Sequence, residues 1–475
     1  MLFPTITFAI FFLVVFTMSW LLMPNFRAWK AFMIAASYVF YAWWDWRFCL
    51  LLAASTVVNQ VAAVRLARSR SRAAARWWLV GGIVANLGLL GWFKYYGFFA
   101  SSLDNFLGLF GLNGPLPLLD IVLPVGISFL TFRAISYLLD VWRAKLAPGP
   151  HADVALYFCF FPYMMAGPIV RAADLLPQLG APRDPRRIDS SRALFLIFAG
   201  LVKKLLIADY LASHLANGVF ATPDGYSSLE TLLGVYAYAV QIYCDFSGYT
   251  DMAIGTGLLL GFQFPDNFNA PYAALSVQDF WRRWHITLSS WLRDYLYIGL
   301  GGNRKGRLRT YINLMVTMLL AGLWHGAAWT FVAWGGLHGS GLAVERVFKD
   351  RRKTRGLPEP APTWYGNALR RLLVFHFVTF CWIFFRADSF AAAGRVIARL
   401  FTAWGASSPN IGLALVGLIA AGIAIQYVPP RVTLSLQAGF SRLAPPVQGV
   451  VCAVGLFLIA ALGPQGPALF LYFKF

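Results

Sequence analysis

The sequence has few charged residues. Only 13% of its 475 residues are Asp, Glu, Lys or Arg, against about 25% in ordinary soluble domains, whereas 59% are hydrophobic. This composition excludes a soluble globular fold, because a chain of this length has too little interior to bury so much apolar surface. Apolar runs of roughly the 20 residues that span a bilayer recur along the chain. The sequence therefore predicts an all-α, polytopic integral membrane protein.

Cysteine is also scarce. The five cysteines form no Cys-x-x-Cys pair, and most lie inside apolar runs, which disfavours disulfides and thiolate metal sites. His338 and His376 stand singly in separate apolar runs and no Cys-x-x-Cys-His occurs, so bis-histidine haem ligation is disfavoured as well. The chain also lacks P-loop and Rossmann spacings. We therefore predict no metal and no permanently bound cofactor.

Acidic residues are half as frequent as basic ones. The chain has 20 Asp and Glu and 40 Lys and Arg, which gives a formal net charge of +20. The basic residues cluster between apolar runs. Membrane topology accounts for that pattern, and no nucleic-acid partner is predicted. Five arginines between 65 and 76 place this loop in the cytoplasm. Counting back three spans puts the N-terminus on the periplasmic side of a bacterial inner membrane.

The apolar runs predict about eleven transmembrane helices with re-entrant pieces, in one membrane-embedded domain over 1–475 with its core at 120–347. The run 98–119 is broken by Gly and Pro and is expected to be an outer loop or a half-helix. The stretch 153–170 is predicted to be re-entrant, because its Pro and Gly are tolerated at membrane depth only where protein surrounds the backbone. No internal repeat of transporter type is visible.

Several polar residues lie inside apolar runs. Lys203 and Lys204 sit in the middle of one predicted span, where they either snorkel to the interface or line a pocket. Asp245 and Asp251 lie six residues apart, which on one helix separates them by about 240°. Gly248 predicts a helix break that would let both carboxylates, with Ser247 between them, point into one cavity. Asp245, Ser247 and Asp251 are therefore candidates to line a tunnel.

The stretch 278–339 is the predicted catalytic region. It holds His325, flanked by Trp324 and Gly326, in a run with almost no other ionisable residue. Burial there favours the neutral imidazole, which can act as a general base on a hydroxyl or thiol that attacks a thioester. The alternative is a packed histidine bonded to a backbone carbonyl. Gly326 permits close approach of a ligand, and Trp324 is a further candidate to line the tunnel.

A second histidine, His285, lies in a basic, aromatic segment. Hydrophobic residues at 280, 281, 284, 288, 291 and 292 have helical spacing, which predicts an amphipathic helix near the cytoplasmic face. Arg282 and Arg283 are then interfacial anchors or contacts for an anionic donor. The loop 301–306 follows, and its Asn303, Arg304 and Lys305 are candidates to bind the phosphates of a coenzyme.

Long segments of the chain resemble the membrane-bound O-acyltransferase family, in the bacterial branch that includes alginate O-acetyltransferase membrane subunits. The resemblance lies in Phe280-Trp-Arg-Arg-Trp-His-Ile-Thr-Leu-Ser289, Trp291-Leu-Arg-Asp-Tyr-Leu-Tyr-Ile298, Leu300-Gly-Gly-Asn-Arg-Lys305, Leu323-Trp-His-Gly326, residues 243–254, Trp382-Ile-Phe-Phe-Arg386 and the aromatic C-terminus. It covers nearly the whole chain. One departure is Gly299, where this branch would have proline.

The resemblance implies an O-acyltransferase in which His325 is the family's buried histidine and His285 its second motif residue, often Asn, Asp or His. It also implies a cytosolic thioester donor such as acetyl-CoA, an exported polysaccharide such as alginate as acceptor, and a periplasmic SGNH-type partner protein. D-alanyl transfer to teichoic acid shares this architecture and stays open. So does a transporter or flippase, in which Asp245, Asp251, Lys203 and Lys204 would form a path.

Overall fold

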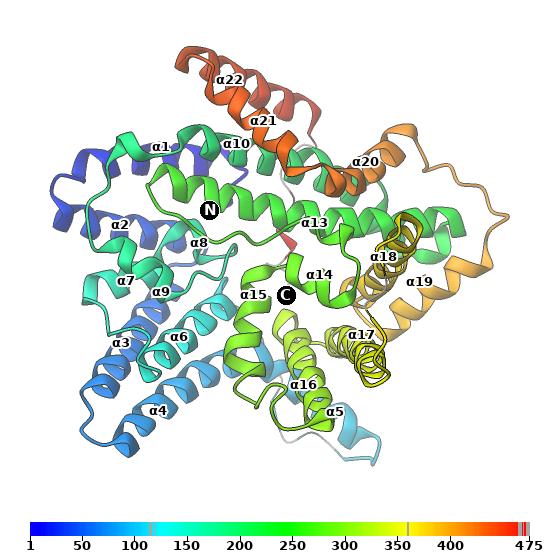
Figure 1. Cartoon of the computed structure of the whole chain (residues 1–475), viewed down its shortest axis with the longest axis horizontal. Helices are drawn as coiled ribbons and strands as arrows, with labels where there is room; N and C mark the ends of the chain where they lie inside the picture. The colour runs from blue at the N-terminus through cyan, green and yellow to red at the C-terminus, as the bar shows by residue number, and fades with distance from the viewer. Residues whose placement is uncertain are drawn as a thin grey trace. The chain divides into compact units, whose positions relative to one another are not determined.

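The computed structural model describes residues 1–112, 114, 116–117, 119–358, 361–463, 468 and 470–471. All regular elements in these residues are helices, which confirms the all-α prediction (Figure 1). The backbone groups into two compact units, one comprising 1–190 with 256–265 and the other 191–255 with 266–475. The single domain over 1–475 stays a prediction.

Nine α-helices lie in the described residues of the first unit. They are α1 (Ile6–Leu22), α2 (Phe26–Ala42), α3 (Arg47–Arg68), α4 (Arg72–Leu90), α5 (Tyr96–Gly108), α6 (Ile127–Trp142), α7 (His151–Cys159), α8 (Phe161–Met164) and α9 (Ala172–Leu175).

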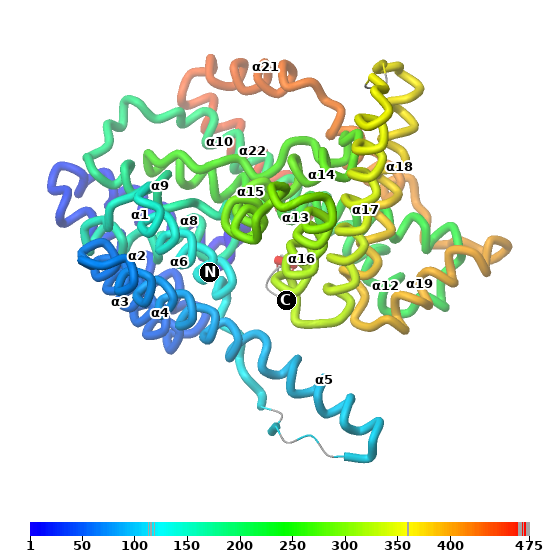
Figure 2. The backbone as a smooth tube through the Cα atoms, turned by 60° about the horizontal axis from the view of Figure 1, so that its bottom comes forward, coloured from blue at the N-terminus to red at the C-terminus, as the bar shows by residue number. Residues whose placement is uncertain are grey.

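Helices α3, α4 and α6 lie side by side in this unit (Figure 1). A Cβ at Gly82 of α4 would come within 2.6 Å of Leu138 on α6, so glycine permits this close packing. Helix α4 continues through a π-helical turn, η1 (Gly91–Tyr95), into α5, which extends beyond its neighbouring helices (Figure 2). The first part of the run 98–119 is therefore helical to Gly108, and residues 113, 115 and 118 lie outside the described part.

The stretch 153–170 is interrupted as the sequence predicts. Helix α7 ends at Cys159, α8 is a single turn, and residues 165–170 are non-helical. Every residue from 160 to 170 is buried, so protein surrounds this irregular backbone. That is the condition under which such backbone is tolerated at membrane depth.

The described part of the second unit contains the remaining helices, and both His285 and His325 lie in it. Its α-helices are α10 (Ser190–Leu201), α11 (Asp209–Leu211), α12 (Asn217–Ala221), α13 (Ser228–Leu259, whose last residues fall in the first unit), α14 (Val277–Arg283), α15 (Ile286–Trp291), α16 (Arg307–His325), α17 (Trp329–Thr354), α18 (Trp364–Arg386), α19 (Phe390–Thr402), α20 (Leu413–Ala424), α21 (Pro430–Ser441) and α22 (Pro445–Leu462).

Helix α13 corrects one expectation. It runs unbroken from Ser228 to Leu259, so Gly248 does not break it. A Cβ at Gly248 would lie 2.7 Å from the carbonyl oxygen of Gly200, and one at Gly200 would lie 2.5 Å from that of Gly248. These two glycines therefore serve the close approach of two helical segments, a use of small residues common in membrane proteins.

Helices α16 and α17 form a tightly packed pair, and they meet just after His325. A Cβ at Gly322 would come within 2.2 Å of the Phe331 carbonyl oxygen, and one at Gly335 within 2.2 Å of the Met318 carbonyl oxygen. Glycine at both positions lets the two backbones touch, which fixes where α16 ends.

The described residues contain four helices that are long and apolar enough to cross a membrane. They are Arg47–Arg68, Arg72–Gly108, Trp364–Arg386 and Pro445–Leu462, and Leu413–Tyr427 with Pro430–Ser441 forms a further pair bent by 97°. The count of about eleven spans is not confirmed. Several apolar runs fold into shorter helices, since α1 and α2 have 17 residues each and α6 has 16.

Candidate active site

His285 lies at a sharp break in the backbone rather than within one amphipathic helix. Helix α14 ends at Arg283, α15 begins at Ile286, and His285 itself adopts a left-handed conformation with φ 43° and ψ 55°. The predicted continuous helix is therefore wrong at this residue. The apolar residues at 280, 281, 284, 288, 291 and 292 are buried in protein, and His285 is 0% exposed.

Asn267 holds the start of α15 in place. Its carbonyl oxygen accepts a hydrogen bond from the Ile286 N–H at 3.0 Å. Its side-chain oxygen accepts from the Thr287 N–H at 3.2 Å and from the Thr287 hydroxyl at 2.9 Å. These three bonds replace the intrahelical bonds that the break removes, and they position the His285 side chain.

Helix α14 is anchored at its other end. The Ser276 hydroxyl accepts from the Asp279 N–H at 3.0 Å, as an N-cap residue does. The Glu345 carboxylate of α17 accepts from the Val277 N–H at 2.5 Å and the Gln278 N–H at 3.1 Å. A carboxylate at a helix N-terminus is electrostatically favourable, so α17 holds α14 against it.

His325 is the last residue of α16. The helix ends at Gly326, where a Cβ would lie 2.1 Å from the ring of Phe331. The imidazole is 2% exposed. Its ring centroid lies 4.9 Å from Trp324, 5.0 Å from Trp334 and 5.3 Å from Phe385, all in edge-to-face arrangements.

The structure brings the two predicted histidines together. Their ring centroids are 6.4 Å apart, and the Trp324 ring lies 6.0 Å from that of His285. On its other side the His285 ring meets Phe246 of α13 edge-to-face at 4.7 Å. The two imidazoles thus lie close together, with their ring planes tilted by 53°, among aromatic rings of one compact unit. A neutral imidazole can accept and return a proton.

His338 has a different setting. It is fully buried, and its Nδ1 accepts a hydrogen bond from the Trp281 indole N–H at 3.3 Å. Its ring is nearly parallel to that of Phe280 at 6.0 Å and meets Trp334 at 4.9 Å. His338 therefore supports the aromatic wall behind His325.

A buried ion cluster lies beside the histidines. The Lys204 ammonium contacts Asp209 at 2.7 Å and Asp245 at 2.8 Å, and all three side chains are at most 5% exposed. Lys203 forms a separate ion pair with Asp251. Asp245 and Asp251 thus engage neighbouring lysines of η4 (Val202–Ala208) rather than meeting in one cavity. Ser247 is buried on α13 between them.

The two carboxylates of that cluster also hold the described C-terminal residues. The Leu471 N–H donates to Asp245 at 2.9 Å, and the Ala468 N–H donates to Asp209 at 3.2 Å. Phe470 stacks on Tyr249 at 4.6 Å and lies 5.7 Å from Phe246, the residue that faces His285. The C-terminal segment therefore completes the wall around the site.

Sequence reasoning missed the wall residues Phe246, Trp334, Phe385 and Phe470. With 17% aromatic residues in the chain, no single ring stands out by type or spacing. The family resemblance gave a signal for three of them, because residues 243–254 contain Phe246, Trp382-Ile-Phe-Phe-Arg386 contains Phe385, and Phe470 lies in the aromatic C-terminus.

The candidate donor contacts differ in exposure. Arg282 is exposed, whereas Arg283 pairs with Asp279 at 2.9 Å within α14. Asn303, Arg304 and Lys305 are exposed on a turn whose glycines at 301, 302 and 306 all have positive φ. The Asn313 amide donates to the Gly302 carbonyl at 2.8 Å and fixes this turn to α16. Asn313 therefore holds this basic turn against α16. The side chains of Arg304 and Lys305 on the turn, and of Arg282 on α14, are charged and exposed.

Comparison with known proteins decides the family. The model of the membrane-bound O-acyltransferase family matches residues 150–385, which include both site histidines. The chain is also 44% identical to the probable alginate O-acetylase AlgI of Pseudomonas aeruginosa, over 78% of this chain and 69% of that protein. This chain belongs to the membrane-bound O-acyltransferase family. It is an acyltransferase and an integral membrane protein.

Two other relatives of this membrane-bound O-acyltransferase widen the comparison. The peptidoglycan O-acetyltransferase of Helicobacter pylori is 37% identical over 78% of this chain and 73% of its own length. The teichoic acid D-alanyltransferase of Streptococcus thermophilus is 29% identical over 58% of this chain and 70% of its own length. The transporter alternative is wrong, because the family consists of acyltransferases.

Proposed function

We propose that the protein is an O-acetyltransferase of the bacterial inner membrane that passes acetyl groups to an exported polysaccharide such as alginate. The observation that carries the proposal is the buried pair of His285 and His325, 6.4 Å apart. Support also comes from the alginate O-acetylase and the peptidoglycan O-acetyltransferase, which match this chain with higher identity and over more of its length than the D-alanyltransferase does.

His325 acts as the general base in this proposal. Its imidazole takes the proton from an attacking hydroxyl as that oxygen bonds to the carbonyl carbon of the acyl thioester. The carbon–sulfur bond then breaks, and the imidazolium returns the proton to the leaving thiolate, so that an ester and a free thiol form. The aromatic wall excludes water, which would otherwise hydrolyse the thioester.

His285 contributes the second polar contact. With its ring facing His325 across the site, it is placed to hold the thioester carbonyl or the attacking oxygen. Hydrogen-bond donors aimed at the oxygen on which charge develops typically lower a barrier by about 3–4 kcal/mol. We infer that His285 orients the acyl group and that His325 moves the proton.

The donor in this proposal is acetyl-CoA or another cytosolic acyl thioester. The exposed Arg282, Arg304 and Lys305, with Arg283 and Asn303 beside them, would meet its phosphates at the cytoplasmic face. The acetyl group would leave toward the periplasm, where an SGNH-type protein completes transfer to the polymer. The N-terminus is then periplasmic, as the arginine-rich loop after the third span predicts.

The experiment that tests this function measures acetylation of the exported polymer in cells that carry His325→Ala at normal protein levels. Acetylation should be lost. His214→Ala is the matched control, because His214 is an exposed histidine stacked on Tyr210 in the same unit. Full acetylation with His325→Ala, or unacetylated but D-alanylated polymer in wild-type cells, would overturn the proposal.

A further inference from the structure

The hairpin between α3 and α4 concentrates positive charge where two membrane helices end. Helix α3 ends at Arg68, α4 begins at Arg72, and both belong to candidate membrane spans. Arg65, Arg68, Arg70, Arg72 and Arg76 are all exposed on this hairpin. Helices of this length and hydropathy can cross a bilayer, which would place these arginines at the level of the lipid headgroups.

No acidic residue balances these arginines. The sequence has no Asp or Glu between Asp45 and Asp104. Within the described residues, none of the five arginines forms an ion pair. Two of them lie over tryptophan rings, with Arg65 6.0 Å from the ring of Trp78 and Arg72 5.8 Å from that of Trp142.

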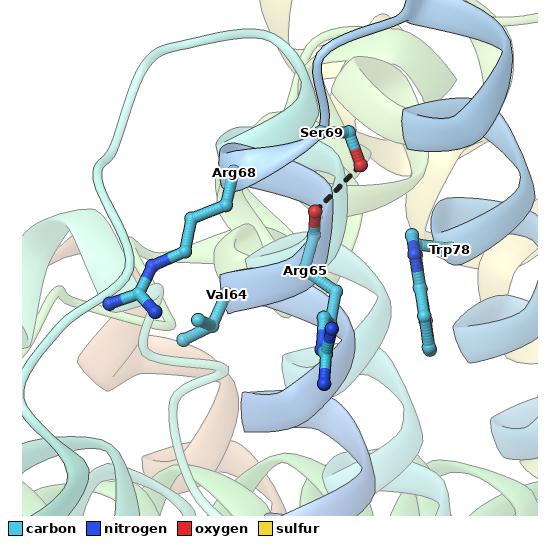
Figure 3. A pocket seen from close by; sticks show the side chains of 5 residues that line it. All are labelled: Val64, Arg65, Arg68, Ser69 and Trp78. Carbon is cyan, nitrogen blue, oxygen red and sulfur yellow. Dashed lines mark hydrogen bonds between the residues drawn. The ribbon is translucent and has the colours of Figure 1, made fainter.

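Two hollows lie between these side chains. One, of about 370 Å³, is lined by Val64, Arg65, Arg68, Ser69 and Trp78. Figure 3 shows Arg65 extending toward the Trp78 ring and Arg68 reaching past Val64, with the Ser69 hydroxyl bonded to the Arg65 carbonyl oxygen at 2.7 Å. The second hollow, of about 900 Å³, is lined by Arg72, Arg76, Trp77 and Trp142 among others.

Helix stability explains only part of this charge. Arg65 and Arg68 lie in the last turn of α3, where cations favourably meet the helix dipole. Arg72 and Arg76 lie in the first turns of α4, where the same dipole opposes cations. Trp77 and Trp78 are 75% and 42% exposed beside them. Exposed tryptophan is typical of the membrane interface, where the indole sits among lipid headgroups.

We propose that this hairpin binds the headgroups of anionic phospholipids on the cytoplasmic leaflet. The phosphate would bind an arginine guanidinium, which can meet phosphate oxygens with paired hydrogen bonds. The tryptophan rings would pack against the glycerol and upper acyl chains. Basic clusters at the cytoplasmic ends of membrane helices attract anionic lipid, and here the two hollows supply defined positions for it.

The test uses the full-length protein in detergent, titrated with phosphatidylglycerol or phosphatidylcholine and read by native mass spectrometry. Arg65→Gln/Arg72→Gln removes one arginine from each hollow. We expect its affinity for phosphatidylglycerol to fall roughly tenfold or more, with phosphatidylcholine binding unchanged. The matched control is Arg186→Gln/Arg187→Gln, which removes two exposed arginines from another loop of the same unit and should bind as wild type.

Three results would overturn the proposal. One is unchanged phosphatidylglycerol affinity in the hairpin variant, and another is an equal loss in the control. The third is displacement of the lipid by inorganic phosphate or adenosine 3′,5′-bisphosphate, which would assign the hollows to a soluble phosphate. Should the Gln variant fail to fold, Arg65→Lys/Arg72→Lys keeps the charges but loses the guanidinium forks. Wild-type affinity in that variant would equally contradict a guanidinium-built site.

Discussion

The imidazole rings of His285 and His325 lie 6.4 Å apart, yet neither side chain projects from the middle of a helix. His285 stands at a break between two short helices, and His325 stands at the last residue of α16. The geometry of the pair therefore depends on backbone features: a positive φ at one histidine and a glycine after the other.

The backbone at His285 should tolerate asparagine and reject valine. Both replacements have similar volumes, but asparagine adopts the left-handed conformation readily, whereas the conformation costs other residues about 1–2 kcal/mol and β-branched ones more. We expect His285→Val to melt several degrees below His285→Asn in nanodiscs. Equal melting temperatures would show that the positive φ does not select the residue.

The contact between α16 and α17 should tolerate alanine at Gly336 but not at Gly335. At Gly335 the new Cβ would lie 2.2 Å from the Met318 carbonyl oxygen, whereas at Gly336 its nearest neighbour would be Leu319 at 3.5 Å. Gly335→Ala should push the helices apart, displace His325 and lower both acyl transfer and thermal stability. Gly336→Ala should be neutral or slightly stabilising, because alanine favours helix. Indistinguishable variants would contradict the observed packing.

Removal of the Lys204 ammonium should destabilise the protein. Lys204→Met would leave Asp209 and Asp245 buried without their cation, and breaking a buried ion pair in this way typically costs about 3–5 kcal/mol. Because the same carboxylates hold Leu471 and Ala468, the variant should also loosen the C-terminal segment and reduce activity. Thermal unfolding and limited proteolysis measure both effects. Lys353→Met, at an exposed lysine, is the control and should change neither.

The basic turn should affect donor binding more than turnover. Arg304→Gln/Lys305→Gln removes two exposed charges, and since each surface contact contributes little, we expect KM for acetyl-CoA to rise roughly fivefold with kcat nearly constant. The increase should shrink at high salt, because exposed charges are screened. Arg395→Gln, an exposed arginine on α19, should leave KM unchanged. A fall in kcat alone would assign the turn to another role.

The sequence was sufficient for the all-α membrane class, because apolar runs of span length are a local signal that predicts membrane helices. The roles of His285 and His325 stay predictions, although the structure brings their rings together. The break at His285 lacks a local signal, since the flanking residues have regular helical spacing. It forms because Asn267, from a distant segment, supplies the missing hydrogen bonds.

Long-range pairing explains the other differences. Lys204 and Asp245 lie on separate segments, and no spacing rule connects them before the chain is folded. Gly248 by itself predicts a helix break, but the nearby backbone of Gly200 requires glycine at this position. A glycine that serves packing and a glycine that ends a helix are identical in a single sequence. Only the partner element distinguishes them.

The most direct test of His325 as the catalytic base is acetyl transfer by purified protein in nanodiscs. Wild type, His325→Ala and His214→Ala would each be given radiolabelled acetyl-CoA and an acceptor, with folding of each variant verified by thermal unfolding. We predict that wild type and His214→Ala release free CoA and transfer label, and that His325→Ala is slower by about 10²–10⁴-fold, the usual contribution of a general base. A folded His325→Ala protein that transfers acetyl at the wild-type rate would contradict the assignment.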